Sequence, residues 1–114
     1  MTLEHVATLD ELEPGAAKRV VIDGFPIAVV RDSDGTVHAI GDRCSHGDVS
    51  LSDGFVEDCT IECWAHGAKF DLRSGRPLSL PAYEPVPVFR VVIGEDGAIL
   101  VDAEHTIDAT GQEA

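Results

Sequence analysis

Two short segments that each pair a cysteine with a histidine constrain this chain more than any other feature. The first is Cys44-Ser45-His46, and the second, Cys63-Trp64-Ala65-His66, follows after sixteen intervening residues. Thiolate sulfur and imidazole nitrogen are strong ligands for transition metals, and four such ligands bring two loops to one point. The sequence therefore predicts a metal centre with two sulfur and two nitrogen ligands, namely Cys44, His46, Cys63 and His66.

Two thiolates and two imidazoles, divided between two loops, are the ligands of a [2Fe–2S] centre in which histidines replace the cysteines on one iron. The flanking residues extend the match, over Cys44 to Gly54 and over Cys63 to Gly75. Together these motifs resemble the Rieske signature Cys-x-His…Cys-x-x-His. They are especially similar to the soluble Rieske ferredoxins of bacterial ring-hydroxylating dioxygenase systems, over residues 1 to about 102.

The resemblance implies different roles for the four ligands. Cys44 and Cys63 would hold the inner iron, and His46 and His66 the outer iron, nearer to solvent and to a redox partner. Neutral imidazoles donate less charge than thiolates and leave their iron easier to reduce. An added electron should therefore settle on the histidine-bound iron.

Other positions near the ligands also match the family. Gly47 and Gly67 directly follow the two histidines, where the lack of a side chain lets backbone amides approach the inorganic sulfurs. The segment Leu80-Pro81-Ala82 resembles the family's proline loop, which covers the cluster, although Pro81 also fits an ordinary turn. Trp64 is either an exposed contact for a partner or packed beneath its loop.

A structural zinc ion is the main alternative for this ligand set, because zinc also binds two cysteines and two histidines tetrahedrally. The residue order opposes it, since zinc fingers place both cysteines before both histidines and each segment here holds one of each. The flanking residues oppose it further. We therefore expect one [2Fe–2S] cluster.

The remaining cysteine and histidines show no motif. Cys59 lies on a strand pattern four residues before Cys63, and a lone buried thiol is usually a small core residue. With two of the three cysteines assigned to the metal, no disulfide is possible, as expected in a reducing compartment. The histidines His5, His38 and His105 are scattered, and no function is assigned to them.

Short apolar stretches separated by glycine and proline turns predict an all-β fold. Asp23-Gly24, between two β-branched stretches, is a strong hairpin signal. The regular turn spacing and the lack of a long amphipathic helix favour an antiparallel β-sandwich or barrel. The expected strands are 17–22, 25–31, 37–40, 55–56, 60–63, 86–93 and 98–101, with one helical turn at 9–12.

A chain of 114 residues is long enough for one domain with a modest core, which a metal cluster would help to hold together. We expect a Rieske domain at 1–102, a cluster-binding subdomain at about 42–71, and a flexible tail at 103–114. The amino terminus shows no signal peptide, and the longest apolar stretch, 25–30, is too short to span a membrane. A cytoplasmic, monomeric protein is the expectation.

The charge is strongly acidic, with 21 Asp and Glu against 8 Lys and Arg and a net charge of −13. Such a chain should bind neither nucleic acid nor anionic membranes. Between Cys44 and His66 there is no Lys or Arg. The same segment contains five acidic residues, which form either a docking surface or an ordinary solvated face: Asp48, Asp53, Glu57, Asp58 and Glu62.

The resemblance implies a one-electron carrier rather than an enzyme. A flavoprotein reductase would supply the electrons from NAD(P)H, and a terminal oxygenase that hydroxylates aromatic rings would receive them. The chain has too few remaining histidines for the 2-His-1-carboxylate iron site of an oxygenase. Two alternatives stay open: the small Rieske-like subunit of an assimilatory nitrite reductase, and a Rieske protein associated with iron–sulfur cluster assembly.

Residues that are absent predict a low reduction potential. High-potential Rieske proteins carry a disulfide between the ligand loops, where this chain has Val49 and Ala65. They also carry a serine and a tyrosine that donate hydrogen bonds to the sulfurs, where this chain has Ala68 and Phe70. Without these hydrogen bonds the reduced cluster is less stable, so the reduction potential should lie near the low end of the Rieske range.

Overall fold

The structure is a computed structural model that describes residues 3–22, 24–43, 50–64, 67, 69–73, 75–78 and 86–107, with side chains as far as Asp102. Within these ranges the chain forms strands and two short 3₁₀ helices. In chain order they are β1 (Leu3–Thr8), η1 (Leu9–Glu11), β2 (Ala17–Ile22), β3 (Phe25–Arg31), β4 (Val37–Gly41), η2 (Leu51–Asp53), β5 (Phe55–Glu57), β6 (Thr60–Glu62), β7 (Lys69–Asp71), β8 (Val88–Ile93) and β9 (Ala98–Ile107).

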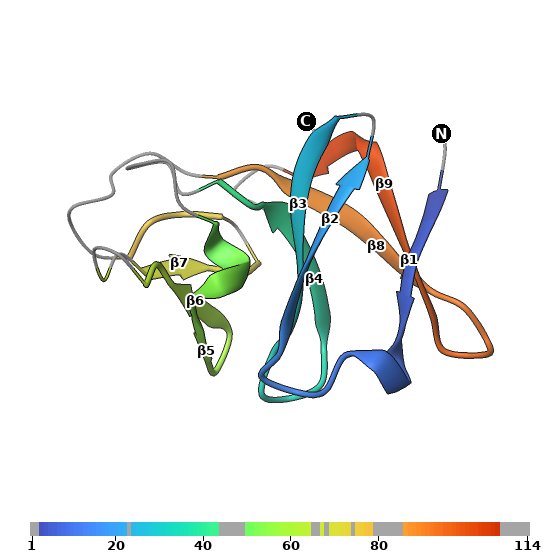
Figure 1. The fold of residues 1–114 in the computed structure, drawn as a ribbon, viewed down its shortest axis with the longest axis horizontal. Coiled ribbons are helices and arrows are strands. Elements are labelled where there is room, and N and C mark those ends of the chain that lie inside the picture. Colours follow the sequence, from blue (N-terminus) through green and yellow to red (C-terminus); the bar gives the residue numbers. More distant parts are fainter. Residues whose placement is uncertain are drawn as a thin grey trace.

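The strands form two antiparallel sheets, which confirms the predicted all-β class. The large sheet has the strand order β1-β9-β8-β4-β3-β2, and the small sheet has the order β5-β6-β7. Figure 1 shows the large sheet curling toward a barrel, with the small sheet against one side of it. In the described part of the chain, no helix has the length and apolar composition needed to cross a membrane.

The predicted hairpin over 17–31 is confirmed. Its strands β2 and β3 have the expected bounds, and Ile22 pairs with Phe25 across a two-residue turn. Gly24 in that turn has φ +80, a left-handed conformation that favours glycine. The sequence signal and the backbone geometry therefore agree at this turn.

Three strand predictions need correction. The sequence analysis missed β1, which pairs with β9, and β7, which pairs with β6. It also ended the last strand at Val101, whereas β9 continues through Ile107 because its backbone pairs with the start of β8, with Ile107 opposite Val88. The tail predicted at 103–114 therefore begins with strand, and residues 108–114 lie outside the described residues.

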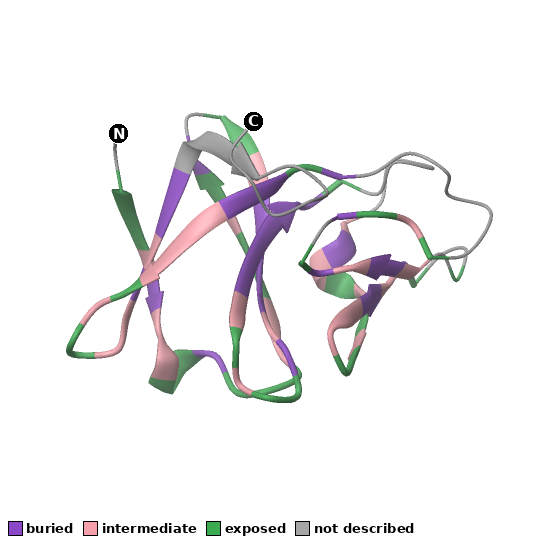
Figure 2. Cartoon of the chain, turned by 180° about the vertical axis from the view of Figure 1, so that it is seen from behind, coloured by how far each residue is buried: buried purple, intermediate pink, exposed green. Residues whose placement is uncertain are grey.

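Strand β3 separates two hydrophobic cores. Its side chains point alternately to the two faces, so Ala28 and Val30 pack toward the small sheet, and Ile27 and Val29 pack inside the curl of the large sheet. All four are fully buried, which explains why β3 reads as a continuous apolar run. Figure 2 shows buried residues on both sheets. The core between the sheets is the one that reaches the predicted metal centre.

Candidate metal centre

The structure describes one of the four predicted ligands, Cys63. The other three, Cys44, His46 and His66, lie outside the described residues, as do Gly47 and the segment Leu80-Pro81-Ala82. The described residues do define the bases of both ligand loops. Their contacts show how close the fold brings the two loop bases.

The first ligand loop leaves the end of β4 and returns at η2. Arg43 and Ser50 form an isolated antiparallel bridge, so the two residues that flank the first ligand loop lie side by side. Gly41, the last residue of β4, donates its N–H to the Pro87 carbonyl at 2.8 Å. A Cβ on Gly41 would meet the Pro87 ring, so the glycine is required by this close approach.

Asp42 fixes the base of the first loop. Its side chain is 2% exposed, and its Oδ1 accepts a hydrogen bond from the Ser52 N–H at 2.9 Å. Oδ2 lies 3.2 Å from Nε of Arg19, whose side chain is 55% exposed. The Asp42 N–H donates to the Pro26 carbonyl, and the Asp42 carbonyl accepts from the Leu51 N–H. One carboxylate thus links the two ends of the loop to β2.

Replacing Asp42 with alanine should destabilise this loop base. The Ser52 amide would lose its partner in a partly buried position, which is expected to lower the free energy of unfolding by about 1–3 kcal/mol. Asp42→Asn, which keeps the Oδ1 acceptor, should cost less. Arg19→Ala removes only a half-exposed partner and should cost at most ~1 kcal/mol. Urea unfolding of the cluster-loaded protein measures all three, and an equal effect of Arg19→Ala would contradict the role of Asp42.

The second ligand loop begins where β6 ends. The Cys63 carbonyl accepts a hydrogen bond from the Gly67 N–H at 2.9 Å, which holds these two residues together. Gly67 has φ +73, and no described atom lies within 4 Å of the position that a Cβ would take. Among the described residues, backbone conformation rather than crowding therefore accounts for glycine at position 67.

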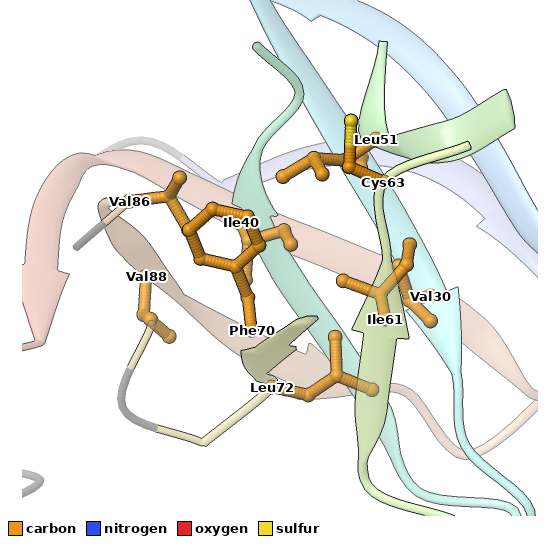
Figure 3. Close-up of a cluster of buried hydrophobic side chains, with 10 residues drawn as sticks. Val30, Ile40, Leu51, Ile61, Cys63, Phe70, Leu72, Val86 and Val88 are labelled. Atoms are coloured by element: carbon orange, nitrogen blue, oxygen red, sulfur yellow. The ribbon is translucent and has the colours of Figure 1, made fainter. Parts of the chain in front are cut away.

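The core between the sheets joins the two loop bases. Leu51, at the return of the first loop, and Cys63, at the start of the second, are both fully buried in one hydrophobic cluster with Phe70. Figure 3 shows Leu51 beside Cys63, with the sulfur of Cys63 pointing away from Ile61. A Cβ at Gly54 would collide with the Glu62 carbonyl, so η2 also lies directly against β6.

The donor set fits an iron–sulfur cluster better than an ordinary core. Cys63 is a fully buried cysteine with no disulfide in the described part of the chain. Its sulfur is positioned where the bases of two ligand loops meet, and the loop sequences supply a second thiolate and two imidazoles. Such a mixed sulfur and nitrogen set suits a [2Fe–2S] centre.

The surface around Cys63 carries an exposed aromatic side chain and a partly buried acidic one. Trp64 is 54% exposed, so it is not packed beneath its loop. Glu62 directly precedes Cys63 and lies 3.9 Å from Lys69. Glu57 and Asp58 are at the opposite end of the small sheet, because Glu57 pairs with Thr60 across the β5–β6 turn. The acidic residues are therefore less concentrated around the ligand than their spacing in sequence suggests.

Sequence reasoning missed a second group of chemically active side chains. Nε2 of His38 lies 2.8 Å from Oδ2 of Asp32 and 3.8 Å from Sγ of Cys59. Burial alone would raise the pKa of Asp32, but hydrogen bonds from His38 and from two backbone amides outweigh it and lower that pKa. Burial raises the pKa of the Cys59 thiol. No motif links these residues, and only folding brings them together.

Comparison with known proteins identifies the family. Residues 3–90 match the family model of the Rieske [2Fe–2S] domain. The chain is 42% identical over 102 residues to the 3-phenylpropionate/cinnamic acid dioxygenase ferredoxin subunit of Photorhabdus laumondii, covering 89% of this chain and 94% of that protein. The similarity therefore extends over nearly the whole length of both chains.

Solved structures show the same fold. The ferredoxin of carbazole 1,9a-dioxygenase from Nocardioides aromaticivorans IC177 aligns with a TM-score of 0.82 at 41% identity, covering 89% of this chain and 97% of that one. The ferredoxin in a complex of reduced oxygenase and oxidized ferredoxin of carbazole 1,9a-dioxygenase aligns with a TM-score of 0.81 at 36% identity, over 87% of this chain and 100% of that one. The chain therefore belongs to the Rieske [2Fe–2S] family and carries one Rieske-type [2Fe–2S] cluster.

Proposed function

We propose that this protein is a one-electron carrier whose cluster is held by Cys44 and Cys63 on one iron and by His46 and His66 on the other. The observation that carries the proposal is the meeting of the two loop bases, where Leu51 and Cys63 share one buried cluster. A bound [2Fe–2S] cluster supplies reversible one-electron transfer. The chain's own residues position it at one end of the small sheet, away from the β5–β6 turn.

The partner that receives the electron is a terminal oxygenase. Support comes from relatives that are named as ferredoxin subunits of aromatic dioxygenases and from the solved complex of a similar ferredoxin with its oxygenase. The donor is a flavoprotein reductase that draws on NAD(P)H. The protein acts in the cytoplasm as a monomer and turns over no organic substrate by itself.

The side chains on either side of Cys63 in the sequence form the docking surface. We define this surface by Trp64, which is 54% exposed, and by the partly buried Glu62 beside it. An exposed aromatic side chain offers apolar contact area at small entropic cost, and a nearby carboxylate steers the approach of a basic partner. Electrons would then leave by a short route, since the second ligand loop starts at this surface.

Electron transfer from the reductase should slow as the salt concentration rises. Exposed charges are screened over ~8 Å at physiological ionic strength. Glu62→Gln should lower the association rate at low salt by about fivefold at most, because a charge pair at 4 Å in water is worth ~1 kcal/mol. The control is Glu57→Gln, which removes an equal charge from the far end of β5 and β6. Stopped-flow reduction of the cluster by the reductase measures the rates.

Two outcomes would contradict the docking surface. One is a rate that does not depend on salt in the wild type. The other is an equal loss of rate in Glu62→Gln and Glu57→Gln, because then only net charge would matter. If the cluster is reduced by the reductase but never reoxidised by a terminal oxygenase, the electron-carrier role would hold and the proposed acceptor would be wrong.

A further inference from the structure

Three metal-binding side chains converge at the junction between the two sheets, away from the ligand loops. Asp32 follows β3, His38 lies in β4, and Cys59 directly precedes β6. Their donor atoms all lie within 4.8 Å of one another. The side chains of Asp32 and His38 are 4% and 9% exposed, and Cys59 is partly buried. Chain segments from both sheets therefore contribute to one compact group.

The geometry excludes a nucleophilic triad. In a triad the carboxylate and the nucleophile contact different nitrogens of the histidine ring. Here the Asp32 carboxylate and the Cys59 sulfur both lie near the same atom, Nε2 of His38, at 2.8 Å and 3.8 Å. An oxygen, a nitrogen and a sulfur donor thus lie within 4.8 Å of one another, close enough to share one ion.

The carboxylate is already oriented for such an ion. Oδ1 of Asp32 accepts hydrogen bonds from the backbone N–H groups of Asp34 at 2.9 Å and Thr36 at 3.0 Å. These bonds hold Oδ1 in the turn and direct Oδ2 toward His38. Hydrogen bonds to a ligating carboxylate of this kind fix its orientation in metal sites.

The two turns that carry the ligands are also held together. The Ser33 N–H donates to the Asp58 carbonyl at 3.3 Å, and the Asp58 N–H donates to Ser33 Oγ at 3.1 Å. The β3–β4 turn and the β5–β6 turn are therefore docked through residues adjacent to Asp32 and Cys59. The position of Cys59 relative to Asp32 is thus set by the fold rather than by a flexible side chain.

We propose that Asp32, His38 and Cys59 form a second metal site, separate from the cluster, that binds one zinc ion with a fourth position open to water. Zinc accepts this mixture of sulfur, nitrogen and oxygen donors in a tetrahedral arrangement. Tetrahedral bonds of about 2.0–2.3 Å place neighbouring donors about 3.3–3.6 Å apart. The Asp32–His38 separation of 2.8 Å is shorter than this by about 0.5 Å, the His38–Cys59 separation of 3.8 Å is longer by about 0.2 Å, and the donors of Asp32 and Cys59 lie within 4.8 Å of each other.

The charges balance at the proposed site. A thiolate and a carboxylate supply two negative charges, and a neutral imidazole adds a lone pair, so one divalent ion neutralises the site. On binding, the thiol proton of Cys59 leaves to solvent, and His38 binds through Nε2 as a neutral imidazole that keeps its one proton on Nδ1. The charge of Arg73 lowers the pKa of the Cys59 thiol, and the charge of Asp71 raises it.

A surface pocket borders the proposed site at His38. The pocket has a volume of about 290 Å³, and its lining includes His38, Leu72 and Arg73. Zinc bound here would join the large sheet, which carries Asp32 and His38, to the small sheet, which carries Cys59. Because the ion binds only the folded arrangement, it should raise the unfolding temperature of the protein.

Zinc K-edge X-ray absorption on the cluster-loaded protein tests the proposal, because this edge is blind to iron. After addition of one equivalent of zinc, we expect one sulfur at about 2.3 Å and nitrogen or oxygen ligands at about 2.0–2.1 Å. Cys59→Ala should lose the sulfur shell and bind zinc at least about tenfold more weakly, a loss of 1.4 kcal/mol or more. His38→Gln should lose affinity as well.

His5→Gln, which alters an exposed histidine on β1, is the matched control and should bind zinc like the wild type. Iron and sulfide content must stay constant through the titration. Zinc bound without a sulfur neighbour, equal affinity in Cys59→Ala, no binding to the wild type, or zinc entering only as iron is lost would each overturn the proposal. None of these results bears on the electron-carrier role.

Discussion

Replacing His66 with alanine is expected to remove the [2Fe–2S] cluster from the purified protein. An iron that loses one of its two imidazoles keeps an incomplete shell, and the nearby Cys59 lies at the other end of β6 from Cys63. His46→Ala should have the same effect. Iron and acid-labile sulfide analysis, together with the visible absorption of the cluster, measures the loss.

The histidine variants are a cleaner test than variants of Cys63. Cys63 is fully buried in the core between the sheets, so Cys63→Ala would also alter packing against Leu51 and Phe70. His5→Ala is the control, because His5 is exposed on the edge strand β1. Full cluster content in His66→Ala would refute the proposed ligand set.

The second large effect is on the reduction potential, which we expect near −150 mV, at the low end of the Rieske range. Phe70 has no hydroxyl to donate to a cluster sulfur, and the acidic surface further disfavours the more negative reduced state. Phe70→Tyr should raise the potential by about 40 mV if the new hydrogen bond favours the reduced state by ~1 kcal/mol. Protein-film voltammetry reports both values.

The structure supports this choice of position. Phe70 is fully buried in the same hydrophobic cluster as Cys63, and Figure 3 shows its ring between Val86 and Ile40. Phe55→Tyr is the matched control, because Phe55 is 62% exposed on the same sheet and its hydroxyl would meet water. A wild-type potential above about +100 mV, or equal shifts in both variants, would contradict the argument from missing donors.

The strands that the sequence predicted well have strong local signals. The β2–β3 hairpin follows from a two-residue Asp-Gly turn between β-branched runs, and both strand bounds agree with the structure. Strand β1 lacked such a signal, because it is an edge strand with exposed Leu3, Glu4 and His5 and is held by its backbone pairing with β9. Such a strand cannot be predicted from its own residues, because it forms by pairing with a strand that is distant in the sequence.

The candidate sites also differ in whether a local sequence pattern predicts them. The ligand pattern is local, so sequence alone could propose all four ligands and the family. The clustering of Asp32, His38 and Cys59 depends on how two turns dock, which local patterns do not encode. The acidic residues show the converse, since Glu57 and Glu62 are close in sequence but lie at opposite ends of a strand pair.

The EPR spectrum of the dithionite-reduced protein tests the central claim most directly. The account predicts two irons and two sulfides per chain and a rhombic signal. Histidine ligation should lower the average g value of this signal below that of a [2Fe–2S] cluster with four cysteine ligands. Freshly purified protein that holds stoichiometric zinc without iron or sulfide, or a reduced cluster with the average g value of the all-cysteine type, would contradict the account.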